Sequence, residues 1–161
     1  MRRFFALALV AITAACSSAD AAPDQALAQA TTTDPDLPTV LVYKSPTCGC
    51  CNGWVEHMEA AGFVVDARNT TDLMTVKRDG GVPPQMSSCH TAIIDGYVVE
   101  GHVPAEQVKQ LLAKRPEVAG IAVPGMPIGS PGMEGANPQP YQVLSFTHAG
   151  EPAVFSNVDP R

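Results

Sequence analysis

The sequence predicts an α/β fold in which strands and helices follow the order β-α-β-α-β-β-α. Two observations lead to this prediction. Short β-branched, apolar runs alternate with segments whose apolar residues have helical spacing, and glycine and proline separate the segments. An Asp-Gly pair also joins two neighbouring apolar runs, as in a tight β-hairpin. The chain has 161 residues, a length that suits one domain with its own core.

The first strand is predicted at residues 39–43, where Thr-Val-Leu-Val-Tyr lies between two prolines. A helix follows, with Thr47 as its predicted N-cap and Gly62 as its stop. Its apolar positions follow helical spacing and are Cys51, Trp54, Val55, Met58 and Ala61. Residues 63–66 (Phe-Val-Val-Asp) predict a second strand.

A short second helix is predicted from a cap at Asp72 through Lys77, and two glycines end it. Residues 91–94 and 97–101 form the predicted β-hairpin around the Asp-Gly turn. Pro104 is then expected in the first turn of a third helix, which ends near Lys114 and Arg115.

Residues 120–140 contain five glycines, five prolines and two methionines, which predicts an irregular Gly/Pro/Met-rich loop. A C-terminal β-hairpin is predicted after it, from residues 141–146 and 153–155. The complete order, with cysteine at the first strand–helix junction, is thioredoxin-like. We therefore assign residues 39–158 to one thioredoxin-like metal-binding domain that includes the loop.

The N-terminus predicts export. Residues 1–15 combine Arg2 and Arg3 with an uncharged run that is too short to span a bilayer, which is typical of a signal peptide. The sequence Thr13-Ala14-Ala15-Cys16 resembles a bacterial lipobox, which makes Cys16 the lipidated residue; cleavage after Ala21 is the alternative. Residues 16–38 are polar and predict a flexible leader. The predicted location is the bacterial periplasm, with a lipid anchor as the only contact with a membrane.

The net charge of −6 makes the chain a poor candidate for binding nucleic acid or anionic lipid. Its chemistry points instead to the cysteines. Cys48, Cys50 and Cys51 crowd into one C-x-C-C motif, and Cys89 is the fourth. At a helix N-terminus the C-x-x-C pair favours the thiolate, and soft sulfur ligands select Cu(I), zinc or iron–sulfur clusters. Copper is the soft metal that an exported protein has most reason to handle, so a copper site is the first explanation of these cysteines. Structural disulfides are the alternative explanation.

Cys89 and His90 precede the third strand, at the junction where thioredoxins place a cis-proline beside the first helix. His90 is therefore a candidate ligand, and His102 is a weaker one. Met126 and Met133 lie on the Gly/Pro loop, where a thioether is a soft Cu(I) ligand; packing beneath the loop is the alternative. Of the other histidines, one at position 57 is expected at the surface and one at position 148 in a turn.

Four motifs, in residues 42–51, 88–92, 100–104 and 125–133, resemble those of the CopG-type family of periplasmic copper-resistance proteins. This family is unrelated to the DNA-binding repressors of the same name. The resemblance implies a thioredoxin-like fold and copper handling in the cell envelope. It also implies a copper site on the four cysteines of the C-x-C-C motif and position 89.

The leading hypothesis is an envelope protein that binds copper for resistance or homeostasis. It would hold Cu(I) and cycle it with Cu(II) through coupled thiol chemistry, and other envelope copper-handling proteins would be its partners. The alternative is an enzyme, a periplasmic thiol–disulfide oxidoreductase with Cys48 as the attacking thiolate and Cys51 as the resolving thiol.

Overall fold

The computed structural model describes residues 33–161. The predicted signal peptide, the lipidation site Cys16 and the leader up to residue 32 lie outside the described residues. The remaining leader residues contact the domain, because the Asp34 N–H donates to the Gly62 carbonyl oxygen (2.8 Å) and Leu37 packs against the core. None of the helices in residues 33–161 combines the length and apolar character needed to cross a bilayer.

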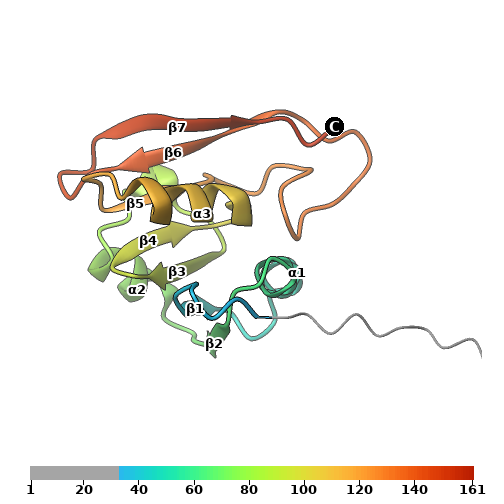
Figure 1. Cartoon of the computed structure of the whole chain (residues 1–161), viewed down its shortest axis with the longest axis horizontal. Helices are drawn as coiled ribbons and strands as arrows, with labels where there is room; N and C mark the ends of the chain where they lie inside the picture. The colour runs from blue at the N-terminus through green and yellow to red at the C-terminus, as the bar shows by residue number, and fades with distance from the viewer. Residues whose placement is uncertain (1–32) are drawn as a thin grey trace, which may run out of the picture.

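Strands and helices alternate along the described chain (Figure 1). The elements are β1 (Val40–Lys44), α1 (Gly49–Ala60), β2 (Val65–Asn69), α2 (Leu73–Asp79), the short 3₁₀ helix η1 (Pro84–Met86), β3 (His90–Ile94), β4 (Tyr97–Glu100), α3 (Ala105–Lys114), β5 (Gly120–Ala122), β6 (Tyr141–Phe146) and β7 (Pro152–Val158). The α/β, thioredoxin-like order with added C-terminal strands is thereby confirmed.

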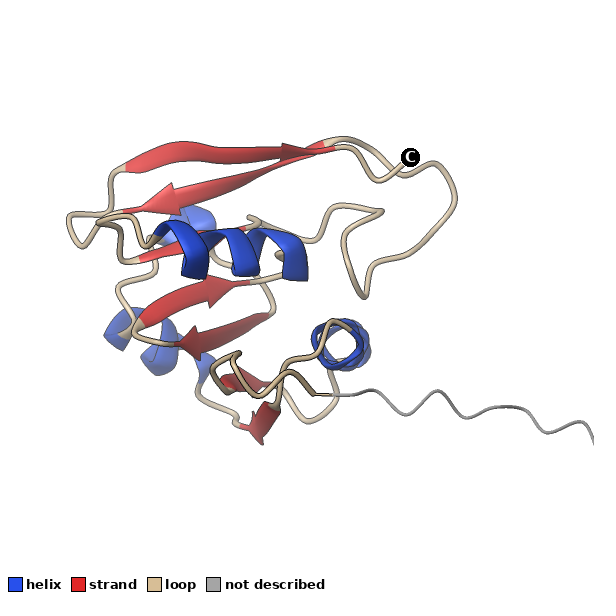
Figure 2. Cartoon of the chain, in the orientation of Figure 1, coloured by secondary structure: helices blue, strands red, loops and turns tan. Residues whose placement is uncertain are grey.

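All seven described strands form one mixed sheet in the order β2-β1-β3-β4-β5-β6-β7. Helices lie on both of its faces (Figure 2). On one face α1 and α3 bury Trp54, Met58 and Leu111 against the central strands. On the other face Val82 and Met86, which follow α2, belong to a second cluster beneath β4, β5 and β6. Burial of these apolar side chains supplies the main driving force for the fold.

The prediction of an irregular loop throughout residues 120–140 is wrong at its start. Residues Gly120–Ala122 form β5, which pairs parallel with β4 and antiparallel with β6. All three residues are buried. Gly120 is required here because a Cβ would collide with the carbonyl oxygen of Val98. A three-residue buried strand is too short to show an alternating pattern, yet it joins the C-terminal hairpin to the main sheet.

Two element boundaries near the first helix also differ from the prediction. The N-cap of α1 is Cys48, whereas the Thr47 hydroxyl contacts that of Ser45 at 3.2 Å. The second strand begins at Val65, and Phe63 is instead a buried core residue. The cysteine motif therefore starts at the helix cap itself, which places its sulfurs at the N-terminal end of α1.

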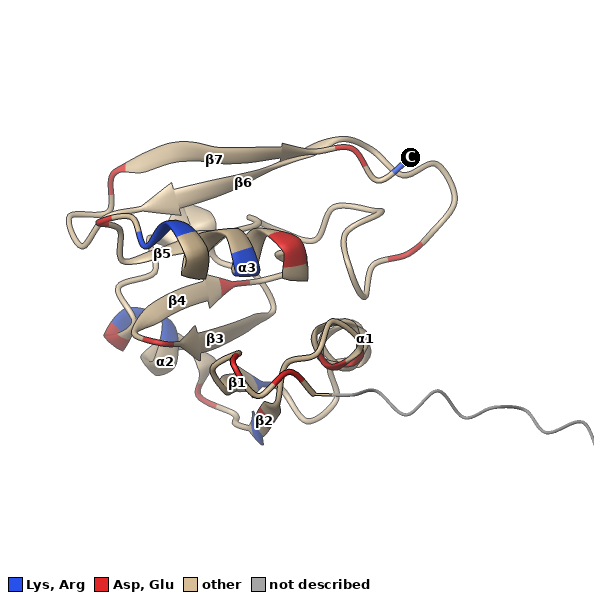
Figure 3. Ribbon diagram, viewed as in Figure 1, with Lys and Arg blue, Asp and Glu red and all other residues tan. Residues whose placement is uncertain are grey.

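The other two helices are capped close to the predicted positions. Asp72 caps α2 by accepting a hydrogen bond from the Thr75 N–H at 3.2 Å, as predicted. Pro104 is the N-cap of α3 and not a residue of its first turn. Glu106 near the start of α3 and Lys114 at its end complement the helix dipole (Figure 3).

Candidate metal centre

The C-x-C-C motif occupies the N-terminus of α1. Cys48, at the cap, forms a disulfide with Cys51, and their Cα atoms are 5.3 Å apart. Cys51 is fully buried, whereas Cys48 and Cys50 are half-buried. Cys50 and Cys89 are the free thiols of the described residues. The predicted C-x-x-C pair is therefore present in its oxidised form, beside two thiols that can still bind a soft metal ion.

Cys89 brings the fourth sulfur to this helix end, where the sequence predicted it. Its Sγ lies 3.9 Å from the Sγ of Cys50, which is in turn 3.5 Å from the Sγ of Cys48. The Sγ of Cys51 is 3.7 Å from the Cys89 carbonyl oxygen. All four sulfur atoms lie within 4.8 Å of one another. When the Cys48–Cys51 disulfide is reduced, such a cluster fits a soft cation, because four thiolates then face one small volume.

His102, the weaker candidate in the sequence, makes the shorter histidine contact. Its Nε2 lies 2.9 Å from the Sγ of Cys89, and its Nδ1 lies 2.8 Å from the carbonyl oxygen of Pro131. A carbonyl oxygen only accepts hydrogen bonds, so Nδ1 is assigned the proton and Nε2 presents a lone pair to the thiol. This is the form of imidazole that binds metal ions, with its other nitrogen fixed by a backbone partner.

His90 contacts the same sulfur from the start of β3. Its Nδ1 lies 3.4 Å from the Sγ of Cys89, and its ring packs 4.6 Å from the Trp54 ring and 5.1 Å from the His102 ring, between centroids. The ring is fully buried, and its Nε2 has no hydrogen-bond partner within the described structure. Burial, followed by the charges of His102 and Lys77, lowers the pKa of His90 to about 3.

These environments set the protonation states of the centre. Burial also lowers the pKa of His102, so both imidazoles are neutral near pH 7. Burial, with Cys50 as the next cause, raises the pKa of Cys89 to about 12, so its thiol is protonated. A metal ion that binds Cys89 must therefore displace a proton.

Cys89, His90 and His102 offer ligand atoms within 4.8 Å of one another, so Cys89 belongs to both groups of donors.

The loop between β5 and β6 reaches over the start of α1 (Figure 1). Gly132 sits so close that a Cβ there would collide with the Cys50 carbonyl oxygen and lie 2.7 Å from the Trp54 amide nitrogen. This packing brings the Pro131 carbonyl to His102. The sequence does not predict this contact, because a backbone carbonyl carries no side-chain signal.

The two loop methionines differ in exposure. Met126 is 51% exposed, whereas Met133 is half-buried and follows the glycine that packs on α1. Met133 is anchored by its backbone, because its N–H donates to the Ser130 carbonyl oxygen at 2.8 Å. Their role as ligands stays a prediction.

The expectation that His57 is a surface residue is wrong. His57 is half-buried, and its Nε2 accepts a hydrogen bond from the Ala105 N–H at 3.0 Å. It therefore satisfies a free amide at the start of α3, since Pro104 offers no side-chain cap. His148 is in the β6–β7 turn, as predicted.

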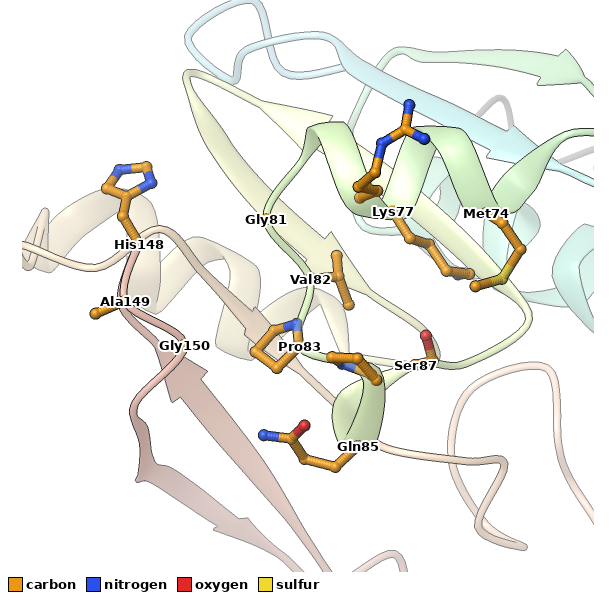
Figure 4. Close-up of a pocket in the computed structure, with 12 residues that line it drawn as sticks. Met74, Lys77, Gly81, Val82, Pro83, Gln85, Ser87, His148, Ala149 and Gly150 are labelled. Carbon is orange, nitrogen blue, oxygen red and sulfur yellow. The ribbon is translucent and has the colours of Figure 1, made fainter.

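A cavity of about 660 Å³ lies apart from the cysteines, between the segment around η1 and the β6–β7 turn (Figure 4). Its lining includes no cysteine. Two residues of the lining carry atoms that bind soft metals, Met74 and His148, and Figure 4 shows them at opposite ends of the cavity. The structure therefore does not bring them together, and the cavity is separate from the candidate metal centre.

Comparisons with known proteins find one matching family model and similar solved structures. A family model described as "Protein of unknown function, DUF411" matches residues 86–133. A solved structure named copper resistance protein CopG, form 2, is similar with a TM-score of 0.73 and 43% identity, covering 77% of this chain and 100% of that chain. Form 1 of the same protein gives a TM-score of 0.72 and 44% identity, covering 76% and 98%. A search of curated protein sequences finds no match.

Proposed function

The chain belongs to the family of the copper resistance protein CopG, and we propose from this premise that it binds copper ions as its cargo at the centre around Cys89. The observation that carries the proposal is the geometry of two donor groups that share Cys89. The four sulfurs lie within 4.8 Å of one another, and the Cys89 sulfur and the two imidazoles offer ligand atoms within 4.8 Å of one another. Thiolate and imidazole are both established copper ligands, and thiolate favours Cu(I).

In this proposal the reduced protein provides the high-affinity form. Reduction of the Cys48–Cys51 disulfide frees two more thiols beside Cys50 and Cys89. His102 through its Nε2, and His90 through the Nδ1 that faces Cys89, would supply nitrogen to the same ions. Met126 and Met133 remain candidates for further soft contacts from the loop.

We also propose that copper and thiol redox chemistry are coupled here. Forming the Cys48–Cys51 disulfide from two thiols releases two electrons and two protons, and the electrons would reduce two Cu(II) ions to Cu(I). The support is that the disulfide lies next to a free thiol, with 3.5 Å between the sulfurs of Cys48 and Cys50. An external reductant would then restore the dithiol.

A titration of the reduced mature chain tests the copper proposal. Cu(I) is added anaerobically against a competing chelator, and the affinity and stoichiometry are compared between the wild type and Cys50→Ser. We expect tight binding in the wild type and a loss of affinity of about 10-fold or more in the variant, by analogy with metal-site substitutions. Weak binding, or binding that does not depend on Cys50, contradicts the proposal.

A second candidate function is a thiol–disulfide oxidoreductase. It is favoured by the disulfide at a helix N-terminus, with Cys48 half-buried and Cys51 fully buried. Against it, the segment before β3 is covered by the chain itself: Gly125 N–H donates to the Ser87 carbonyl oxygen (3.3 Å), and the Ser88 hydroxyl donates to the Gly125 carbonyl oxygen. A peptide substrate would have to displace these bonds.

Insulin reduction assays distinguish the two candidates. An oxidoreductase should reduce insulin disulfides, should lose this activity in Cys48→Ser and should keep it in Cys50→Ser. A copper-binding protein should reduce insulin no faster than the Cys48→Ser variant does.

For the location we propose the bacterial periplasm, with a lipid on Cys16 and with copper-handling envelope proteins as partners. The support is the sequence of residues 1–16 alone. Metabolic labelling with palmitate should mark the wild type and not Cys16→Ala. Release of both proteins into the soluble periplasmic fraction contradicts the anchor.

A further inference from the structure

A buried carboxylate links three segments next to the candidate metal centre. Glu100 is the last residue of β4, and its side chain is fully buried. Its Oε1 accepts hydrogen bonds from the Ser88 N–H (2.6 Å) and from the Lys77 ammonium (2.5 Å). Its Oε2 accepts from the Thr91 hydroxyl at 2.7 Å. Both oxygens of the carboxylate therefore accept hydrogen bonds. Lys77 also donates to the Thr91 hydroxyl oxygen at 3.0 Å.

These contacts surround the residues that carry the donors. Ser88 directly precedes Cys89, and Thr91 directly follows His90, so the carboxylate holds the chain on both sides of the Cys-His pair. Glu100 is itself two residues before His102. The register of the sheet pairs Thr91 with Glu100, which fixes the ends of β3 and β4 side by side.

The network and the metal donors lie on opposite faces of this sheet end. His90 packs on Trp54 of α1, whereas Glu100 and Thr91 bind Lys77 of α2. The carboxylate therefore does not compete with the donors for a metal ion. It can act only through the backbone position of the segment that it holds.

From this arrangement we propose that Glu100 is a positioning residue for the metal centre: its carboxylate holds the Ser88 N–H and thereby sets the distance between the Cys89 sulfur and His102. This inference rests on the proposed copper function. A role in stability alone does not account for the network, because a buried ion pair is often replaceable by apolar residues without loss of stability. What apolar residues cannot replace is a directed hydrogen bond to one amide beside Cys89.

Two substitutions separate positioning from charge. Glu100→Gln keeps the length of the side chain and an oxygen that can accept from Ser88, but it removes the charge that neutralises Lys77. Glu100→Asp keeps the charge, but it withdraws the oxygens by one methylene and loses the reach to Ser88. If Glu100 positions Cys89, Glu100→Gln binds Cu(I) nearly as the wild type does, whereas Glu100→Asp binds about 10-fold or more weakly.

Thermal unfolding provides the contrast with a purely structural role. Glu100→Gln leaves the buried Lys77 ammonium without a carboxylate, so it should lower the midpoint of unfolding more than Glu100→Asp does. The order of the two variants is therefore expected to reverse between stability and Cu(I) affinity. Loss of affinity that follows the loss of stability, or failure of both variants to fold, overturns the proposal.

A double-mutant cycle locates the effect. The affinities of wild type, Glu100→Asp, Cys89→Ser and the double variant are measured by Cu(I) titration of the reduced full mature chain against a chelator. If Glu100 acts through Cys89, the Glu100→Asp loss disappears in the Cys89→Ser background, whereas independent losses overturn the proposal. If the wild type fails to bind Cu(I), the proposed function is contradicted as well. If the wild type binds but the affinity losses of Glu100→Asp and Cys89→Ser are independent, only this inference is contradicted.

Discussion

The candidate metal centre has two unequal halves that share Cys89. We call Cys48, Cys50 and Cys51 the sulfur half, and His90 and His102 the imidazole half. The sulfur half lies at the end of a helix, with two of its three cysteines half-buried and two of them joined in a disulfide. The imidazole half is fully buried. It is held in place by the Trp54 ring and by the Pro131 carbonyl oxygen.

The difference indicates a division of roles. The disulfide of the sulfur half is formed by oxidation and broken by reduction, which changes the number of thiolates available to a metal ion. The imidazole half has no such freedom, since burial keeps its rings neutral and packing keeps their orientation. Under the proposed function, a redox change should therefore alter the sulfur half and leave the imidazole half in place.

The largest effect is expected from Cys89→Ser, because Cys89 contacts both halves. Loss of this sulfur should weaken Cu(I) binding by more than the roughly 10- to 100-fold that supporting residues of metal sites contribute. It should also exceed the loss in Cys50→Ser. Competition titration of the reduced protein measures both.

Met74→Leu serves as the control for this titration. Met74 is another soft donor, but it is 71% exposed and borders the separate cavity. Its substitution should leave the affinity unchanged. A Cys89→Ser variant that binds as well as Met74→Leu would show that the two halves do not share a metal ion.

The next effect is expected at Gly132, which lets the loop approach the helix end. Alanine there adds a Cβ that collides with the Cys50 carbonyl oxygen, at a φ of +80°. The backbone strain alone costs about 1–2 kcal/mol, and relief of the collision should move Pro131 away from His102. Chemical denaturation should report the loss of stability, and the spectrum of the copper-loaded protein should report the change at the imidazole half.

Gly125→Ala is the matched control on the same loop. Gly125 has a similar φ of +68°, but a Cβ there meets no atom within 4 Å. It should therefore show the strain cost without a spectral change. Equal behaviour of the two variants would mean that close packing of the loop does not support the imidazole half.

The sequence predicts the sulfur half better than the imidazole half, and the reason is physical. The C-x-C-C spacing brings Cys48, Cys50 and Cys51 together through local structure. The thioredoxin-like order of the elements places Cys89 beside them, and both signals can be found in a sequence pattern. The position of His102 depends instead on the Pro131 carbonyl, 29 residues away along the chain. A contact of this kind, made by the backbone, depends on tertiary packing.

The fold shows the same division. The alternation of β-branched runs and helical spacing predicted the core through α3, because each element carries its own period. Strand β5 was missed because Gly120–Ala122 takes its structure from its neighbours β4 and β6 and not from its own composition. The cap at Cys48 was missed for a related reason, since Thr47 is the better N-cap by residue type.

A smaller effect is expected from Trp54→Phe, which tests the packing behind the imidazole half. The Trp54 Nε1–H donates to the buried Val103 carbonyl oxygen at 2.8 Å, and phenylalanine cannot replace this bond. The unsatisfied carbonyl should lower the free energy of unfolding by about 1–3 kcal/mol. The control is Tyr97→Phe, which removes a hydrogen bond to the Pro116 carbonyl oxygen at a half-buried position and should cost less. An equal cost in both variants would contradict a special role for Trp54.

The smallest effect is expected from His57, outside both halves. Burial lowers its pKa in the folded protein, so the unfolded chain binds more protons once the pH falls below about 6.5. Stability from neutral His57 is therefore present above that pH and is lost as the pH falls towards the folded pKa. His57→Gln keeps an acceptor for the Ala105 N–H but does not titrate.

Urea denaturation of wild type and His57→Gln between pH 7.5 and 5.5 measures this contribution. The wild type should lose more stability than the variant over this range, by no more than about 1 kcal/mol, the worth of one hydrogen bond. Burial also keeps the rings of the imidazole half neutral in the folded protein, so part of the pH dependence of stability should remain in the variant. His148→Gln, a substitution of the same type in the exposed β6–β7 turn, is the matched control. If His57→Gln follows the wild-type curve, His57 makes no measurable contribution to the acid sensitivity of the fold.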